Sequence, residues 1–95
     1  MTTLEEVRTQ IADIDYDIID LIHKRVDLAE KVLEAKQKDV IKINDSSQNH
    51  VVLDRAVSAA TENNLDTGYV KEIFEILIKM SISRQHELSG DGNLP

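Results

Sequence analysis

The sequence predicts an all-α domain of three helices, and three observations support this prediction. Neither Pro nor Gly occurs between Thr3 and Lys38. Apolar residues recur along this stretch at steps that alternate between three and four, which is typical of a helix packed along one seam. Two later segments, at about 48–62 and 67–87, have a similar apolar side. We therefore expect one long helix, one short helix and one helix of medium length.

The long helix is expected from Thr3 to about Lys38. Thr2 and Thr3 precede Glu5 and Glu6 at the spacing of two overlapping capping boxes. The apolar seam comprises Leu4, Val7, Ile11, Ile14, Ile18, Leu21, Leu28, Val32 and Ala35. Such a helix would be about 54 Å long, whereas a compact chain of this size has a radius of gyration of about 12 Å. The seam therefore needs cover from elsewhere, and we expect a second copy of the chain to provide it.

A connection of turn-forming residues separates the long helix from the short one. Residues 39–47 mix β-branched residues with Asn, Asp and Ser, which favour turns and helix N-caps. The short helix is expected from about Gln48 to Glu62. Asn63 and Asn64 then end it.

The third helix is of medium length. Asp66 and Thr67 are its N-cap candidates, and the apolar residues after them keep the helical period to about Glu87. Residues 1–89 therefore form one helical domain. Residues 90–95 have no periodicity, and we expect them to be a disordered tail.

Composition excludes several classes of function. The net charge of −7 argues against nucleic-acid binding. The chain has no Cys, so it can form neither a disulfide nor a thiolate metal site, and its three His residues lack ligand spacing. No metal or other cofactor is expected. The N-terminus does not resemble a signal peptide, and no apolar run has membrane-spanning length, so we expect a cytoplasmic protein.

Polar side chains interrupt two of the apolar faces. Arg25 occupies a seam position of the long helix, and Lys36 projects from nearly the same face, about 20° round the helix. Ser81 and Gln85 form an i, i+4 pair on the inner stripe of the medium helix. Each residue alone favours an internal network, with Arg25 bonded to an acid and Gln85 to a backbone carbonyl. The set as a whole favours a polar ligand pocket inside the bundle.

Arg8 is a further basic residue of interest. It precedes Arg25 by about 25 Å along the helix, so it cannot reach a small ligand that Arg25 of its own chain holds. Two interpretations stay open. Arg8 is an exposed residue paired with Glu5 or Asp15, which spacing alone favours, or it reaches the pocket of a second chain.

Several stretches together resemble the all-α chorismate mutases. The resemblance covers residues 4 to about 88 and includes the order of long, short and medium helices. The stretches that carry it are Val7-Arg8-Thr9-Gln10-Ile11-Ala12-Asp13-Ile14-Asp15, Lys24-Arg25 before Leu28-Ala29, Ala35-Lys36, Ile43-Asn44-Asp45, Leu65-Asp66 before Tyr69-Val70, and Ser81 with Gln85. It implies an intertwined homodimer with two pockets, each of which takes Arg8 from the other subunit.

The resemblance also implies roles in converting chorismate, a dianion, to prephenate for aromatic amino-acid biosynthesis. Arg25 would bind a substrate carboxylate with help from Ser81. Lys36 and Gln85 would donate hydrogen bonds to the ether oxygen of the enolpyruvyl group. Asp45, or its backbone, would lie near the ring hydroxyl. This concerted [3,3] rearrangement needs no nucleophile, general base or cofactor.

The sequence departs from the family pattern at Gln48 and Asn49, where an Arg and a Glu usually stand in the substrate pocket. Gln48 brings no positive charge, and Asn49 bonds a hydroxyl without a full negative charge, so we expect a weakened mutase. Two alternatives stay open. One is a lyase on the same fold that removes pyruvate from isochorismate. The other is a helical dimer that serves as a non-catalytic or regulatory module.

Overall fold

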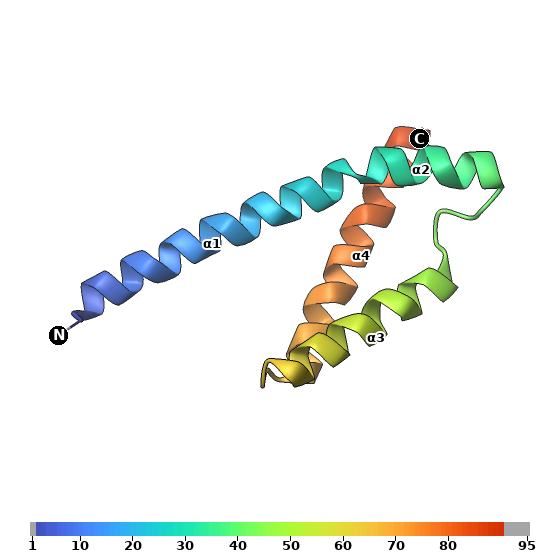
Figure 1. Cartoon of the computed structure of the whole chain (residues 1–95). Coiled ribbons are helices and arrows are strands. Elements are labelled where there is room, and N and C mark those ends of the chain that lie inside the picture. The colour runs from blue at the N-terminus through green and yellow to red at the C-terminus, as the bar shows by residue number, and fades with distance from the viewer. Residues whose placement is uncertain (1, 91–95) are drawn as a thin grey trace.

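The structure, a computed structural model, describes residues 2–90. It contains four α-helices, α1 (Leu4–Asp27), α2 (Ala29–Asp39), α3 (Ser46–Glu62) and α4 (Thr67–Ser89) (Figure 1). No strand occurs among the described residues, and the all-α prediction is confirmed. Gly90 caps α4, whereas the rest of the expected tail, 91–95, lies outside the described residues.

The predicted long helix is divided into α1 and α2 at Leu28. The backbone of Leu28 stays in the helical region, with φ −69° and ψ −13°. Its N–H donates to the Lys24 carbonyl at 3.3 Å, and its carbonyl accepts from the Val32 N–H at 2.9 Å. The two helices therefore run end to end as one rod with a local interruption (Figure 1).

Side-chain caps fix where the helices begin. Thr3 and Glu6 form a capping box at the start of α1. Asp45 caps α3, which therefore begins at Ser46, two residues earlier than predicted. Asp66 caps α4, as one of the two predicted candidates. Each cap satisfies a backbone N–H that the first helical turn leaves without a partner.

A left-handed residue ends α2. Val40 has φ 57° and ψ 45°. The Ile41 N–H donates to the Lys36 carbonyl at 2.8 Å and the Val40 N–H to the Gln37 carbonyl at 3.4 Å, which is the bond pair of a Schellman motif. Glycine usually occupies this position, because a β-branched side chain strains it. The motif ends α2 at Asp39, three residues after Lys36, and turns the chain into the loop that leads to α3.

The core lies between α2, α3 and α4. Of these helices, α4 packs against both α3 and α2, and it also contacts α1 (Figure 1). The buried hydrophobic residues are small or aliphatic, namely Ala29, Leu33, Val52, Ala56, Ala60 and Ile78. In α1, only Ile22, Arg25 and Val26 are partly covered. The C-terminal turns of α1 are therefore the part that joins the core.

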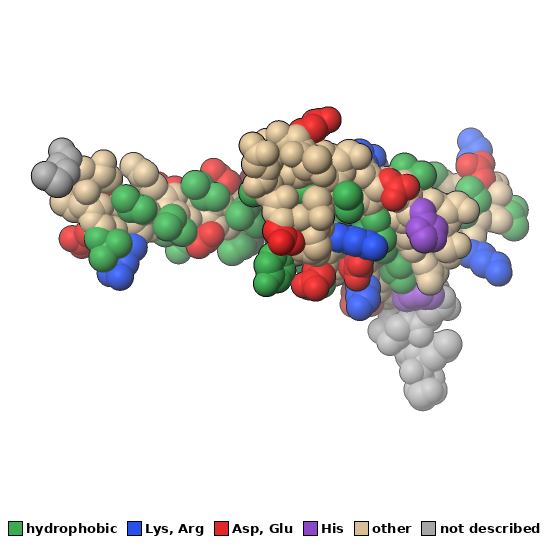
Figure 2. All heavy atoms as spheres, turned by 90° about the horizontal axis from the view of Figure 1, so that it is seen from below, with side chains coloured by type: hydrophobic (Ala, Val, Ile, Leu, Met, Phe, Trp, Pro, Cys, Tyr) green, Lys and Arg blue, Asp and Glu red, His purple; other side chains and the backbone are tan. Residues whose placement is uncertain are grey.

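The rest of α1 projects into solvent. The seam residues from Leu4 to Leu21 are between 38% and 64% exposed, and Figure 2 shows hydrophobic side chains spread along the projecting helix. The radius of gyration is 16.8 Å, against about 12 Å for a compact chain of this length. The chain alone thus leaves the seam uncovered. Within the described range, no helix combines the length and the apolar character that crossing a membrane requires.

Candidate active site

A cavity of about 260 Å³ lies between α2, α3 and α4, beside the last turn of α1. Its lining consists of Arg25, Leu28, Val32, Lys36, Asp45, Gln48, Asn49, Val52, Arg55, Ile78, Ser81, Ile82 and Gln85. Seven of the eight site residues singled out from the sequence are in this lining, and only Arg8 is not. An apolar wall with a few convergent polar groups is typical of a small-molecule site.

A chain of hydrogen bonds crosses the cavity from α2 to α4. Lys36 Nζ donates to the Ile43 carbonyl and to Gln85 Oε1, the latter at 2.9 Å. Gln85 Nε2 donates to Ser81 Oγ at 3.0 Å, and Gln85 is only 2% exposed. Gln85 is therefore bonded to side chains rather than to the backbone carbonyl of the internal-network alternative. Burial lowers the pKa of Lys36, although the nearby Asp45 carboxylate acts in the opposite direction.

Arg25 carries a charge that no carboxylate of the described residues compensates. Its Nη1 donates to the Leu77 carbonyl at 3.1 Å. The ion pairs found among residues 2–90 involve other side chains, so the acidic partner of the internal-network alternative is not found. Burial lowers the pKa of Arg25, and repulsion from the Arg55 guanidinium lowers it further. The negative charge of an anionic ligand would favour the charged guanidinium and so oppose both effects.

The first turn of α3 supplies neutral side chains to the cavity. Asp45 Oδ1 accepts the backbone N–H of Gln48 at 3.3 Å, so the carboxylate at the cavity edge also caps the helix. Asn49 Nδ2 donates to Asn44 Oδ1 at 2.9 Å, which fixes the Asn49 amide against the preceding loop. Gln48 and Asn49 both line the cavity, where they can offer hydrogen bonds but no charge.

Arg55 is a lining residue that sequence reasoning missed. It follows Gln48 by seven residues and Val52 by three, so the three residues share one face of α3. That spacing was the signal from which a place in the cavity could have been predicted. It was hidden because a charged residue on a short helix ordinarily lies on a solvated face.

Arg8 lies on the second turn of α1, outside the lining of the cavity. It is exposed, and its side chain forms no hydrogen bond or ion pair with another described residue. The alternative in which Arg8 pairs with Glu5 or Asp15 is therefore not what the structure has. A role for Arg8 in the pocket of a second chain stays a prediction.

Comparison with known proteins identifies the family. The family described as chorismate mutase type II matches residues 7–86. The chain belongs to this family. The chorismate mutase of Methanocaldococcus jannaschii is 36% identical over 84 residues, which cover 88% of this chain and 85% of that one. The resemblance to the chorismate mutases drawn from the sequence is thereby confirmed.

Other relatives of this chorismate mutase family member are longer or more distant. The bifunctional chorismate mutase/prephenate dehydratase of Buchnera aphidicola subsp. Schizaphis graminum is 31% identical over 81 residues, 85% of this chain. This chain spans only 21% of the length of that relative. The 4-amino-4-deoxychorismate mutase of Streptomyces venezuelae is 21% identical over 75 residues, which cover 79% of this chain and 73% of that one. No solved structure matches the chain.

Proposed function

We propose that the protein is an isomerase that rearranges chorismate to prephenate in aromatic amino-acid biosynthesis. The observation that carries the proposal is the hydrogen-bond chain from Lys36 through Gln85 to Ser81, set in a cavity with uncompensated cations. The reaction is concerted and intramolecular. It therefore asks the protein to bind one conformer and to stabilise growing charge, and both tasks suit these residues.

Binding begins with the carboxylates of chorismate. The guanidinium group of Arg25 can donate two parallel hydrogen bonds to one carboxylate. Ser81 Oγ already accepts a hydrogen bond from Gln85, so its own proton is available to the same carboxylate. Cations at two places in the cavity hold the compact conformer in which the new C–C bond can form. Because binding already orders the substrate in this way, the barrier of the chemical step no longer includes the entropy cost of reaching that conformer.

Stabilisation of the transition state falls to Lys36 and Gln85. An ammonium group has three N–H donors, and two of those of Lys36 go to Ile43 and Gln85. The third can reach the ether oxygen, where negative charge grows as the C–O bond breaks. The second N–H of Gln85 Nε2 is a further donor. Because protein contacts already orient both groups, little reorganisation accompanies the reaction.

The ring hydroxyl is expected near Asp45 and Asn49. The Asn49 amide is fixed by Asn44, so it presents a defined but neutral group. An amide accepts a weaker hydrogen bond from a hydroxyl than a carboxylate does. Gln48 likewise gives orientation without charge. We therefore expect an active enzyme with a lower kcat/KM than one with an Arg and a Glu at these two positions.

Incubation of the purified protein with chorismate and with isochorismate, followed by product identification, tests the proposal. Prephenate from chorismate is the expected result, and a Lys36→Ala protein serves as the control for the uncatalysed rearrangement. Pyruvate release from isochorismate without prephenate formation would point to the lyase alternative. Turnover of neither compound would indicate a non-catalytic helical module.

We expect the working unit to be a homodimer that buries the exposed seam of α1. Six seam residues from Leu4 to Leu21 are exposed in the single chain, and burying apolar surface gains about 25 cal/mol per Å². Equilibrium sedimentation should show a dimer at micromolar concentration, and Ile14→Asp should dissociate or unfold it because the charge enters the seam. A stable folded monomer of the unaltered chain at that concentration would contradict this expectation.

A further inference from the structure

Arg55 is a cation of the cavity for which the proposed mechanism has no role. It lines the cavity from α3, on the same helix face as Gln48 and Val52. Within residues 2–90 its side chain forms no hydrogen bond and no ion pair. Its charge is therefore available to a ligand.

The charges around the cavity favour an anion with more than one negative group. The lining holds three cations, Arg25, Lys36 and Arg55, and one carboxylate, that of Asp45. A net charge of +2 is thus gathered in a chain whose net charge is −7. Arg25 and Arg55 line the same cavity, and repulsion from Arg55 contributes to the lowered pKa of Arg25. A carboxylate placed between them would turn this repulsion into two attractions.

We propose that Arg55 binds a carboxylate of the substrate together with Arg25, and so supplies the positive charge that Gln48 does not. This inference rests on the proposed function, which makes chorismate the dianion. The planar guanidinium fork matches the two oxygens of a carboxylate. Position 55 lies about 10 Å farther along α3 than position 48. The cation therefore approaches the cavity from a different place along the helix, although from the same face.

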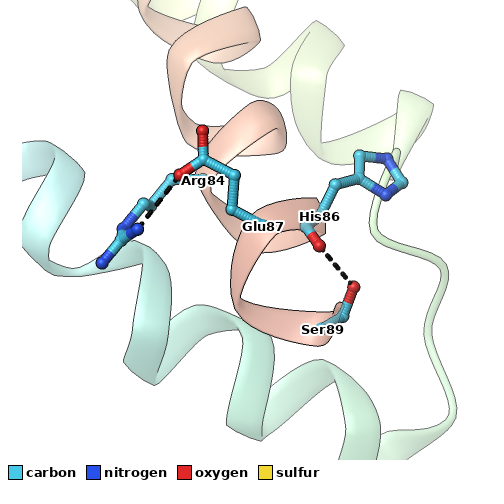
Figure 3. A network of polar contacts seen from close by, with 4 residues as sticks. All are labelled: Arg84, His86, Glu87 and Ser89. Atoms are coloured by element: carbon cyan, nitrogen blue, oxygen red, sulfur yellow. Dashed lines mark hydrogen bonds and ion pairs between the residues drawn. The ribbon is translucent and has the colours of Figure 1, made fainter. Parts of the chain in front are cut away.

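Three variants test the role of Arg55 in binding. Arg55→Gln removes the charge but keeps a polar side chain, and Arg55→Lys keeps the charge without the fork. Arg84→Gln is the matched control, because Arg84 lies on α4, is absent from the described lining of the cavity, and pairs with Glu87 at 3.0 Å (Figure 3). Folding of each variant is checked by circular dichroism and sedimentation.

The expected effect is on binding more than on the chemical step. Loss of a charge-assisted contact in Arg55→Gln should raise the KM for chorismate by about ten- to a hundredfold, with a smaller change in kcat. The KM of the Arg55→Lys protein should lie between those of this variant and the unaltered protein. Arg84→Gln should stay within about twofold of the unaltered protein, because an exposed ion pair contributes little.

Relocating the charge separates a binding role from a structural one. Gln48→Arg returns a cation to the same face of the cavity, and it should lower the KM for chorismate by a larger factor in the Arg55→Gln protein than in the unaltered protein. A structural role of Arg55 predicts instead that Gln48→Arg changes the KM by the same factor in both proteins. Any variant that does not turn over chorismate is titrated with chorismate in a calorimeter, so that Kd replaces KM.

Each outcome decides between the inference and the function on which it rests. If the unaltered protein forms prephenate and Arg55→Gln behaves like Arg84→Gln, the role of Arg55 is overturned and the function stands. If the unaltered protein binds chorismate in an Arg55-dependent manner without forming prephenate, the function is overturned and Arg55 keeps its role. If the unaltered protein neither binds nor converts chorismate, both are overturned.

Discussion

A Lys36→Ala protein is expected to lose about 10²–10³-fold in kcat, because it lacks a preorganised donor to the ether oxygen. The same change should cost little stability. It leaves Gln85 Oε1 and the Ile43 carbonyl without their donor. A buried acceptor without a partner costs about 1–3 kcal/mol, and we expect a water that enters the space of the removed ammonium group to offset most of this cost. The substitution also removes a cation whose burial the folded state disfavours, as the lowered pKa indicates.

Steady-state kinetics with chorismate and thermal unfolding, measured on the same preparations, separate the two effects. Lys38→Ala is the matched control, because Lys38 lies two residues later on α2 with its side chain exposed. It should change neither quantity much. Arg25→Ala should resemble Lys36→Ala in losing far more activity than stability. If either site variant unfolds several degrees earlier while the activity per folded molecule is unchanged, its residue is structural.

Mixing two inactive chains is expected to restore activity, because each pocket should combine Arg8 of one chain with Arg25 of the other. Arg8→Ala and Arg25→Ala chains that are refolded together form heterodimers in which one pocket has both arginines. With random pairing, half of the dimers are heterodimers and one of their two pockets is intact, so about a quarter of the unaltered activity should return.

A second mixture provides the control for complementation. Arg25 and Lys36 line the same cavity of one chain. Refolding Arg25→Ala with Lys36→Ala chains therefore leaves one defect in every pocket, and no activity should return. Background activity in the first mixture, after heterodimers have been verified by mass spectrometry, would count against a shared site.

Local periodicity explains why four polar residues of the cavity could be predicted, whereas Asp45, Gln48 and Asn49 followed only from the family resemblance. The helical repeat places Arg25 and Lys36 on one face whatever the rest of the chain does, and the same holds for Ser81 and Gln85. The approach of these two faces requires only that the apolar stripes around them pack together. Both pairs accordingly line one cavity.

Features that depend on context could not be predicted in this way. The backbone stays helical at the interruption at Leu28, and neither Pro nor Gly occurs there, so the sequence carries no signal for it. Arg55 lines the cavity although it is an exposed residue, and how α3 packs against its neighbours, rather than local spacing, decides this. The position of Arg8 relative to a pocket is set by a second chain, and no spacing within one chain determines it.

The left-handed turn at Val40 links the end of α2 to the position of the Lys36 ammonium group. A β-branched residue in this conformation stores about 1–3 kcal/mol of strain, which persists only while surrounding contacts hold it. One such contact joins Lys36 Nζ to the Ile43 carbonyl, a few residues beyond the turn. The ammonium group thus restrains the loop, and the loop restrains the ammonium group. Loss of Lys36 would let the turn relax and the Asn44–Asp45 segment drift, so its kinetic cost would combine a missing donor with a loosened wall of the cavity.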